Sequence, residues 1–321
     1  MNTNLPVVVL KGLATYVPGL YRLRQSRGTS EPNWSRYCYS VWLRHLVMAW
    51  KHGFTRIPES IAELGPGPSL GAGLAAMLSG ADTYSGLDVV ALVDHTQDLR
   101  ILDELVELYR RREAIPGPEE FPLVGPLMDS YEFPRHILTD ALMERTLSDD
   151  RIEAIRAALR RPETPPNSRI SIGYFAPWYD PAVVRHESVD MVFSQGVLQS
   201  VDELDGTYKA MRDWLKPGGL TSHQIALYSL GTASAWNGHY AYSDWLWRLI
   251  RGKRAYLINR EPCSTHLAYL RKHGFRVITE IRVKKPSDIP RRRLAKRFRN
   301  LSEDDFTTAG AFIQAIKEPL Q

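Results

Sequence analysis

The chain has 321 residues, 44% of them hydrophobic and 24% charged, which is ordinary for a globular protein of one large or two modest domains. Its two cysteines, Cys38 and Cys263, are too few for a disulfide framework and lack metal-site spacing, so a reducing, cytoplasmic location is expected. Residues 1–24 lack the basic start and cleavage site of a signal peptide, and no apolar stretch reaches the ~20 residues that a membrane span needs.

The formal net charge of +5 is distributed unevenly along the chain. Residues 1–50 carry six Lys and Arg against one acid, and residues 282–299 carry nine against one, so the rest of the chain is acidic. Two basic ends could attract nucleic acid, an anionic membrane or a phosphorylated substrate. The alternative is that they are solvated surfaces without a partner.

The first third of the chain predicts a helix followed by a βαβ unit. Apolar and aromatic residues recur at helical spacing over residues 34–53, with Gly53 as the stop. A short buried strand is expected at 60–64, an Ala-rich helix at 70–80 and a second strand ending at Asp88. Strand, glycine turn, helix and strand in this order indicate a parallel sheet.

The strand pattern then stops over residues 92–168. Residues 98–112 predict a strongly amphipathic helix, a Pro-rich stretch follows, and a second helix is expected at 148–160 before the loop 161–168. Because strands resume afterwards, we interpret this region as an inserted helical lid.

The remaining chain predicts five further strands, separated by helices at 202–215 and 263–275 and by an aromatic-rich insertion at 228–261. The expected strands are 169–175, 189–194, 220–227, 276–283 and 309–318. This makes seven strands, and the final two are able to pair as an antiparallel hairpin.

Three glycines follow the first strand with the spacing Gly65-x-Gly67-x-x-x-Gly71. Glycines permit close backbone approach to a ligand, and the helix after them offers free N–H groups. Asp88, 23 residues beyond Gly65 at the tip of the next strand, could accept both hydroxyls of a ribose. The plainer alternatives are a crowded strand-to-helix turn and a carboxylate that caps a turn.

Three motifs in order resemble those of the class I S-adenosylmethionine-dependent methyltransferases: residues 63–71 (ELGPGPSLG), 190–198 (DMVFSQGVL) and 215–219 (LKPGG). The resemblance covers about 57–91, 169–227 and 262–317. It implies an α/β fold with the Rossmann-like seven-stranded methyltransferase sheet over residues 57–321, interrupted by the two insertions and preceded by a helical N-terminal extension, 1–56.

The resemblance also implies S-adenosylmethionine as the cofactor and a role for each matching residue. Glu63, Gly65 and Gly67 would lie at its methionine portion, with Ser69 and Gly71 in the same turn. Asp88, followed by Val89, would hold the ribose. The other expected contacts are Tyr174, Phe175 and Ala176 beside the adenine, and Ser194 and Gln195 near the sulfonium.

Methyl transfer to a hydroxyl needs a base as well as alignment. Many relatives carry Glu-His after the Val-Leu pair, where this chain has Gln199-Ser200. We therefore expect His223, on the fifth strand, to be the catalytic base, with His239, Asp94 and His95 as weaker candidates and a structural histidine as the alternative. No cluster has convincing metal-ligand spacing, so no metal is expected.

The aromatic insertion lies where an acceptor would be recognised, so Trp236, His239 and Tyr240 are predicted substrate contacts, although such rings could equally pack the insertion onto the core.

The stretches YCYSVWLRHL, SHQI and YSDWLWRL look like bacterial methyltransferases associated with polysaccharide and surface-glycan synthesis. We expect O-methylation of a sugar, a glycan or a precursor. Alternatives are another small-molecule acceptor, a nicotinamide-dependent oxidoreductase and a non-catalytic binding protein. Nucleic acid is not expected, since Ala176-Pro177-Trp178-Tyr179 is not the amino-group DNA methylation signature.

Overall fold

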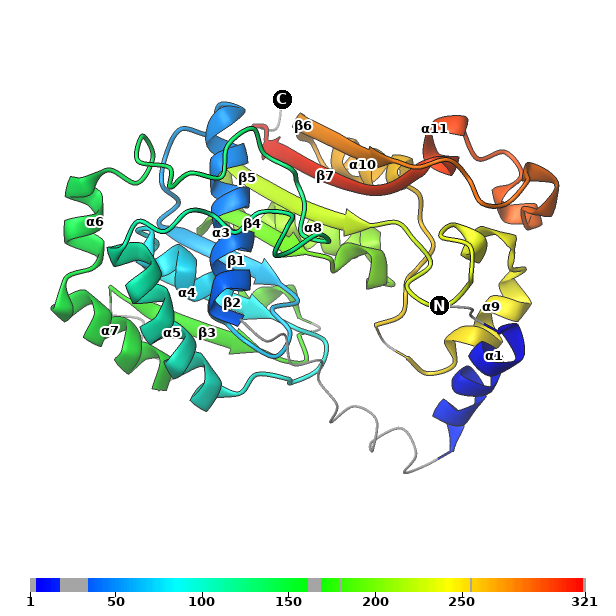
Figure 1. Ribbon diagram of the computed structural model, residues 1–321, viewed down its shortest axis with the longest axis horizontal. Helices are drawn as coiled ribbons and strands as arrows, with labels where there is room; N and C mark the ends of the chain where they lie inside the picture. The colour runs from blue at the N-terminus through cyan, green and yellow to red at the C-terminus, as the bar shows by residue number, and fades with distance from the viewer. Residues whose placement is uncertain (1–3, 18–33, 161–168, 179, 255, 320–321) are drawn as a thin grey trace.

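The computed structural model describes residues 4–17, 34–160, 169–178, 180–254 and 256–319. Its centre is a seven-stranded sheet in the order β3-β2-β1-β4-β5-β7-β6 (Figure 1). The strands are β1 (Ser60–Leu64), β2 (Thr83–Leu87), β3 (Ser171–Phe175), β4 (Val189–Gln195), β5 (Leu215–Ala226), β6 (Phe275–Lys284) and β7 (Thr308–Lys317). β7 runs antiparallel to both β5 and β6, and the other pairings are parallel.

Seven strands with an antiparallel last pair confirm the predicted fold class. One boundary was wrong: β5 begins at Leu215, five residues before the expected start. Lys216-Pro217-Gly218-Gly219 is the irregular beginning of that strand, where the β4–β5 register shifts and Gly218 has φ +73°.

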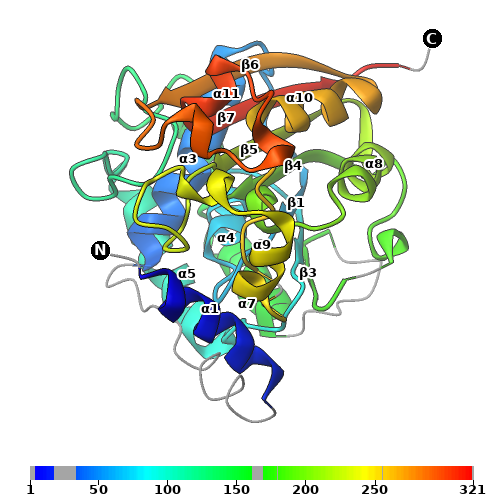
Figure 2. The ribbon, with the colours of Figure 1, turned by 90° about the vertical axis from the view of Figure 1, so that its right-hand side faces the viewer.

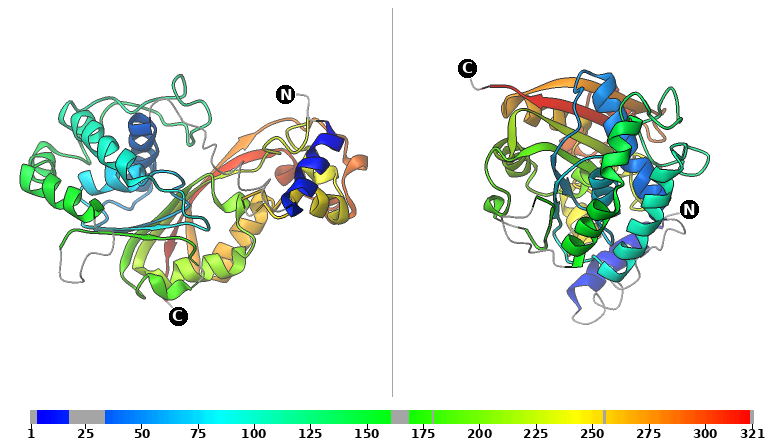
Figure 3. Two further views of the ribbon diagram at one scale, coloured as in Figure 1. Left: turned by 90° about the horizontal axis from the view of Figure 1, so that it is seen from below. Right: turned by 90° about the vertical axis from the view of Figure 1, so that its left-hand side faces the viewer.

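Helices cover both faces of the sheet, as the two views in Figure 3 show. One face carries α3 (Trp34–Lys51), α4 (Gly71–Leu78), α5 (His95–Arg110) and α7 (Asp149–Arg160), and the other carries α8 (Leu204–Trp214) and α10 (Cys263–Lys272). Both strand faces are therefore buried, which is why the strands read as apolar runs rather than alternating ones.

Small residues set how closely α4 approaches its neighbours. A Cβ placed on Gly73 would lie 2.2 Å from the Tyr84 ring of β2, and one placed on Gly71 would lie 2.5 Å from Cys38 Sγ of α3. Neither distance is compatible with a side chain. The Gly- and Ala-rich sequence of α4 is therefore what allows it to pack tightly between the sheet and α3.

The first insertion forms α5, α6 (Asp140–Thr146) and α7. α5 buries Ile101, Leu102, Leu105, Val106 and Tyr109 in the same core cluster as α3 and α4. These helices complete the layer on one face of the sheet, and a lid function for the insertion stays a prediction. The predicted loop 161–168 lies outside the described residues.

The two described helices of the predicted N-terminal extension pack in different places. α3 lies in the core on the sheet, whereas α1 (Leu5–Leu13) packs against α9 (Asp244–Arg251) at the opposite end of the molecule (Figure 1). A Cβ on Gly12 would lie 1.9 Å from the Leu249 carbonyl oxygen, so α1 and α9 cross in close contact.

The segment between β6 and β7 contains α11 (Glu303–Phe306) and packs on the second insertion. Tyr240, in the short 3₁₀ helix Gly238–Ala241, shares a buried cluster with Leu294, Phe298 and Phe306. Among the described residues, no helix is both long and apolar enough to cross a membrane.

Candidate cofactor and acceptor site

The carboxyl ends of β1, β2 and β4 meet at one edge of the sheet, where ligands bind in open α/β folds. The register pairs Leu64 of β1 with Leu87 of β2, and Glu63 with Phe193 of β4. The glycine turn, Asp88 and Gln195 follow these positions directly. The glycine turn, Asp88 and Gln195 therefore do come together.

The glycines of the turn serve different purposes. Gly65 (φ +63°) lies against Val197, and a Cβ on it would come within 2.6 Å of that side chain. Gly67 (φ +71°) has nothing within 4 Å of its missing Cβ. Gly71 packs on Cys38, as described above. Only Gly67 faces open space, and it is there that a ligand can approach the backbone.

Asp88 bridges the end of β2 and the glycine turn. Its Oδ2 accepts a hydrogen bond from the Gly67 N–H (3.1 Å), and its Oδ1 accepts one from the Val89 N–H (2.7 Å). Burial raises the pKa of this carboxyl, which is 8% exposed. Val89 is 42% exposed beside it and offers an apolar surface at the rim.

A carboxylate that sequence reasoning missed lies at the start of α4. Asp98 of α5 is fully buried, and its Oδ1 accepts hydrogen bonds from Ser69 Oγ (2.8 Å) and the Leu70 N–H (2.9 Å). Ser69 in turn accepts a bond from the Gly71 N–H at 3.0 Å. The sequence did contain a signal for this buried role, because Asp98 is an acidic residue on the otherwise apolar face of its helix.

Packing and helix capping thus give Ser69 and Gly71 a structural role. Their contact with the cofactor stays a prediction.

Glu63 is buried in the core rather than presented to a ligand. It is 5% exposed, and its Oε2 accepts a bond from the Tyr84 hydroxyl (2.7 Å). Burial raises the pKa of Glu63 to about 8, and the charges of Asp88 and Asp98 contribute in the same direction. The turn is therefore an acidic environment.

The end of β3 forms a half-buried rim next to Asp88. Tyr174 donates to the Val90 carbonyl (3.3 Å) and accepts from the Leu92 N–H (3.1 Å), which fixes the loop after β2. Phe175 and Ala176 are also half-buried. Their contact with an adenine stays a prediction.

Ser194 and Gln195 point to opposite faces of the sheet, as successive strand residues do. Ser194 is fully buried on the α8 side, where its Oγ lies 2.7 Å from His223 Nδ1. Gln195 is half-buried on the α3 side, with Oε1 3.2 Å from His45 Nε2. Only Gln195 reaches the edge, so the expectation for Ser194 is corrected.

His223 is 1% exposed and packs against Tyr208 of α8. Its second ring nitrogen bonds Thr221 Oγ1, so both nitrogens have protein partners. Burial lowers the pKa of His223 well below its usual value. A neutral, enclosed and doubly bonded ring is a structural histidine, and this geometry argues against the predicted catalytic role.

The predicted substrate contacts in the second insertion are also enclosed. Trp236 is 8% exposed and donates its indole N–H to the Pro286 carbonyl (2.7 Å), and Tyr240 packs on Phe298 with ring centroids 4.9 Å apart. Both hold the insertion on the segment before β7. These contacts favour the packing alternative, and a contact with an acceptor stays a prediction.

His239 borders a cavity of about 10 Å³ together with Tyr228 and Asn259. Its Nδ1 has no hydrogen-bond partner among the described residues, and burial lowers its pKa to about 3. A cavity of this size holds at most one water.

The two remaining candidates for a catalytic base are Asp94 and His95. Asp94 caps α5 through the Thr96 N–H, and the His95 side chain lies outside what the structure describes.

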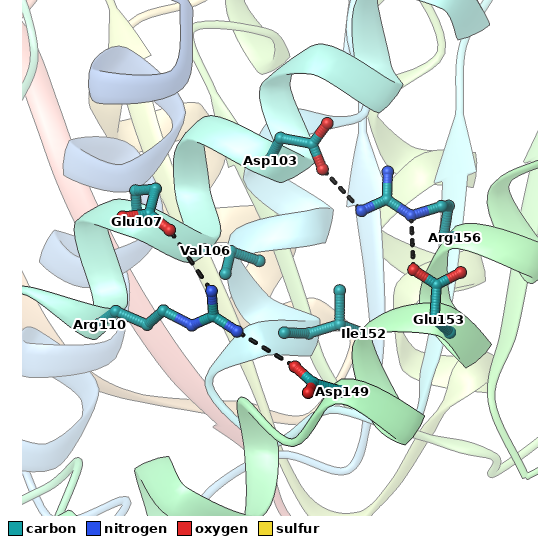
Figure 4. A pocket seen from close by; sticks show the side chains of 8 residues that line it. All are labelled: Asp103, Val106, Glu107, Arg110, Asp149, Ile152, Glu153 and Arg156. Atoms are coloured by element: carbon teal, nitrogen blue, oxygen red, sulfur yellow. Dashed lines mark hydrogen bonds and ion pairs between the residues drawn. The ribbon is translucent and has the colours of Figure 1, made fainter.

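A larger groove of about 300 Å³ lies between α5 and α7, away from this edge (Figure 4). Each of its arginines is paired with two acids: Arg110 with Glu107 and Asp149, and Arg156 with Asp103 and Glu153. The groove therefore offers no unpaired arginine to an anionic ligand. Within the described ranges no group of His, Cys, Asp and Glu could hold a metal ion.

No protein-family model and no curated protein sequence matches the chain. A solved complex of the Haloferax volcanii Trm112 methyltransferase activator with a methyltransferase is similar, at 15% identity, 90% coverage of this chain, 96% of that chain and a TM-score of 0.39. An S-adenosylmethionine-dependent methyltransferase from Mesorhizobium loti is 14% identical; the match covers 80% of this chain and 90% of that chain, with a TM-score of 0.39. One from Methanosarcina mazei has 12% identity, 84% and 97% coverage and a TM-score of 0.43.

The strand order itself assigns the fold. Seven strands in the order β3-β2-β1-β4-β5-β7-β6, with β7 antiparallel, form the Rossmann-like methyltransferase sheet that the resemblance implied.

Proposed function

We propose that the protein is an S-adenosylmethionine-dependent methyltransferase whose cofactor binds at the glycine turn, between Gly67, Asp88 and Val89. The support is the open space at Gly67, the carboxylate at the tip of β2 and the apolar rim beside it. These residues would hold the cofactor, which supplies an activated methyl group, while the chain aligns the acceptor and excludes water.

The observation that carries this proposal is the Asp98 carboxylate at the start of α4. In a nicotinamide-binding fold this helix N-terminus receives the anionic pyrophosphate. Here a buried carboxylate already accepts the Leu70 N–H. A pyrophosphate would be repelled, whereas S-adenosylmethionine, with its sulfonium and ammonium groups, suits the acidic turn.

For the acceptor we propose a hydroxyl of a sugar, a glycan or a precursor, bound at the ends of β4 and β5. Gln195 and Gln224 are neighbours in the β4–β5 register, and both are half-buried at this edge. Neutral amides suit a polar, uncharged acceptor. With His223 enclosed, alignment of the hydroxyl with the activated methyl group is the main contribution of the chain, and the hydroxyl proton is released to solvent water as the methyl group leaves the sulfonium.

Calorimetry tests the cofactor proposal. The wild-type protein is expected to bind S-adenosylmethionine and S-adenosylhomocysteine but not NAD⁺. Asp88→Ala should weaken binding by about 1–3 kcal/mol, the scale of losing charge-assisted hydrogen bonds. Asp149→Ala is the matched control, because that side chain is 93% exposed in the groove between α5 and α7. Binding of NAD⁺ with no binding of either sulfur compound would overturn the proposal.

We further propose a cytoplasmic location, since Cys38 and Cys263 are both buried and unpaired, and a peripheral contact with anionic membrane. Arg292, Arg293 and Lys296 are exposed and form no ion pair within the described residues. This basic segment lies at the same end of the molecule as α1 (Figures 1 and 2), where Leu10 is 63% exposed.

Vesicle co-sedimentation tests the membrane contact. At ~1 kcal/mol for each basic residue near an anionic surface, changing Arg292, Arg293 and Lys296 to Glu should weaken binding to phosphatidylserine vesicles by roughly 100-fold or more. The control changes three arginines elsewhere on the surface to Glu: Arg100 and Arg110 of α5, and Arg111, which caps it. Equal pelleting of the wild type on neutral and anionic vesicles would rule the contact out.

A further inference from the structure

Two stretches singled out in the sequence, YCYSVWLRHL and SHQI, meet in a buried hydrogen-bond chain beside the sheet edge. Gln314 of β7, Ser222 of β5 and His45 of α3 are each fully buried. Gln314 Nε2 donates to Ser222 Oγ (3.0 Å), Ser222 Oγ lies 2.7 Å from His45 Nδ1, and His45 Nε2 lies 3.2 Å from Gln195 Oε1. The hydrogen-bond chain therefore runs from β7 across β5, on the α3 face of the sheet, to the ligand-binding edge.

The donor and the acceptor of each bond in this hydrogen-bond chain follow from its first donor, the Gln314 side-chain amide. Gln314 is oriented by giving a second N–H to the His45 carbonyl (3.2 Å) and by accepting from Thr279 Oγ1 (3.4 Å). Ser222 Oγ therefore receives an N–H, and its own proton needs an acceptor, because a buried hydroxyl left unsatisfied is costly. His45 Nδ1 is that acceptor.

The ring proton of His45 is consequently on Nε2 and is donated to Gln195 Oε1. Burial lowers the pKa of His45 to about 4, so the ring is neutral near pH 7. With Oε1 of Gln195 held by this bond, its NH₂ group is directed away from His45. No partner for that NH₂ group occurs among the residues that the structure describes.

Arg44, the residue before His45, shapes the same edge. It is fully buried and donates to the carbonyls of Val124, Pro116 (2.8 Å) and Pro126 (3.1 Å). This holds the Pro-rich loop so that a Cβ on Gly125 would lie 3.4 Å from the Gln224 side chain. Two consecutive residues of α3 thus act at this edge. His45 orients the Gln195 amide, and Arg44 holds the Pro-rich loop against Gln224, the neighbour of Gln195 in the sheet.

We infer that His45 is a positioning residue, which holds Gln195 with its amide N–H outward as the hydrogen-bond donor that recognises an oxygen of the methyl acceptor. The recognition step rests on the proposed function, whereas the orientation of Gln195 does not. Because His45 Nε2 carries the proton that it donates, His45 does not act as the base in this arrangement.

The hydrogen-bond chain is tested by NMR of the full-length protein with ¹⁵N-labelled histidine and glutamine side chains. We expect the Nε2–H tautomer for His45, assigned by comparison with His45→Gln. The Gln195 side-chain amide, assigned with Gln195→Glu, should exchange rapidly with water. The Nδ1–H tautomer, or a Gln195 amide protected from exchange, overturns the inference.

Two substitutions of Ser222 separate orientation from packing. Ser222→Ala removes the O–H that is donated to Nδ1, so His45 should keep the Nε2–H tautomer while its Nδ1 resonance moves to that of a ring nitrogen without a hydrogen bond. Ser222→Thr keeps the hydroxyl and should keep the wild-type Nδ1 resonance. Thermal melts check that both variants fold, and the wild-type spectrum decides the inference even if neither variant does.

The recognition step is tested with S-adenosylhomocysteine binding and with methyl transfer to nucleotide sugars as probes. Gln195→Glu offers no donor, so KM for a sugar that is methylated should rise about tenfold, the scale of one lost hydrogen bond. An unchanged KM overturns the recognition step. A wild type that binds no S-adenosylhomocysteine instead overturns the proposed function, and the NMR result still decides the orientation of Gln195.

Discussion

Gly67→Val is expected to abolish S-adenosylmethionine binding while the protein remains folded. A valine side chain would fill the space in which Gly67 has no neighbour within 4 Å and through which a ligand reaches the turn. Because φ is +71°, the substitution also strains the backbone by about 1–3 kcal/mol, which lowers the melting temperature without unfolding a protein of ordinary stability. Calorimetry with S-adenosylhomocysteine and a thermal melt measure the two effects separately.

Gly218→Val is the matched control for this substitution. Gly218 has φ +73° and likewise no neighbour within 4 Å, but it lies at the start of β5, at the opposite edge of the sheet from the glycine turn. The two variants should lose similar stability, and only Gly67→Val should lose the cofactor. Full cofactor affinity in a folded Gly67→Val protein would remove the turn from the binding site.

The second large effect is a decrease in the free energy of unfolding with rising pH, which Glu63 causes. Its folded-state pKa of about 8 lies above the unfolded value of 4.5, so between these two pH values the folded state holds a proton that the unfolded state has lost. Stability from this group is therefore fully present below pH 4.5 and decreases until about pH 8. The decrease is on the order of 5 kcal/mol.

Glu63→Gln should remove this dependence, because the amide stays neutral and its oxygen can still accept the Tyr84 hydroxyl. Urea unfolding at about pH 5, 7 and 9 is the measurement, and the variant should gain stability relative to the wild type as the pH rises. Glu104→Gln, at an exposed position of α5, is the control, for which no such gain is expected. A constant difference between Glu63→Gln and wild type over this range would show that Glu63 is ionised in the folded protein.

Local patterns in the sequence were sufficient for the seven strands, the longer helices on the sheet and their order, whereas the helices α6, α9 and α11 were not predicted. The expected helix 34–53 is α3 (Trp34–Lys51), the expected strand 60–64 is β1, and the glycine turn and Asp88 lie where the spacing put them. Apolar periodicity, glycine at tight turns and strand–helix alternation are properties of neighbouring residues, so one sequence shows them.

The sequence did not show on which face of the sheet the side chain of each strand residue lies. Helices cover both faces of the sheet, so no polar alternation marks which side a residue takes. Ser194 and His223 therefore looked like site residues, although both point into the core under α8.

The sequence by itself determined the fold class, the strand order along the chain and the position of the glycine turn. Only the tertiary structure decided which polar groups reach that turn and the end of β4 beside it. Asp98 comes from an insertion and His45 from a helix outside the family resemblance, and each meets the sheet through contacts between distant parts of the chain. Such contacts leave no local periodic signal, because the free energy that selects them comes from burying and pairing polar groups only after the layers have packed.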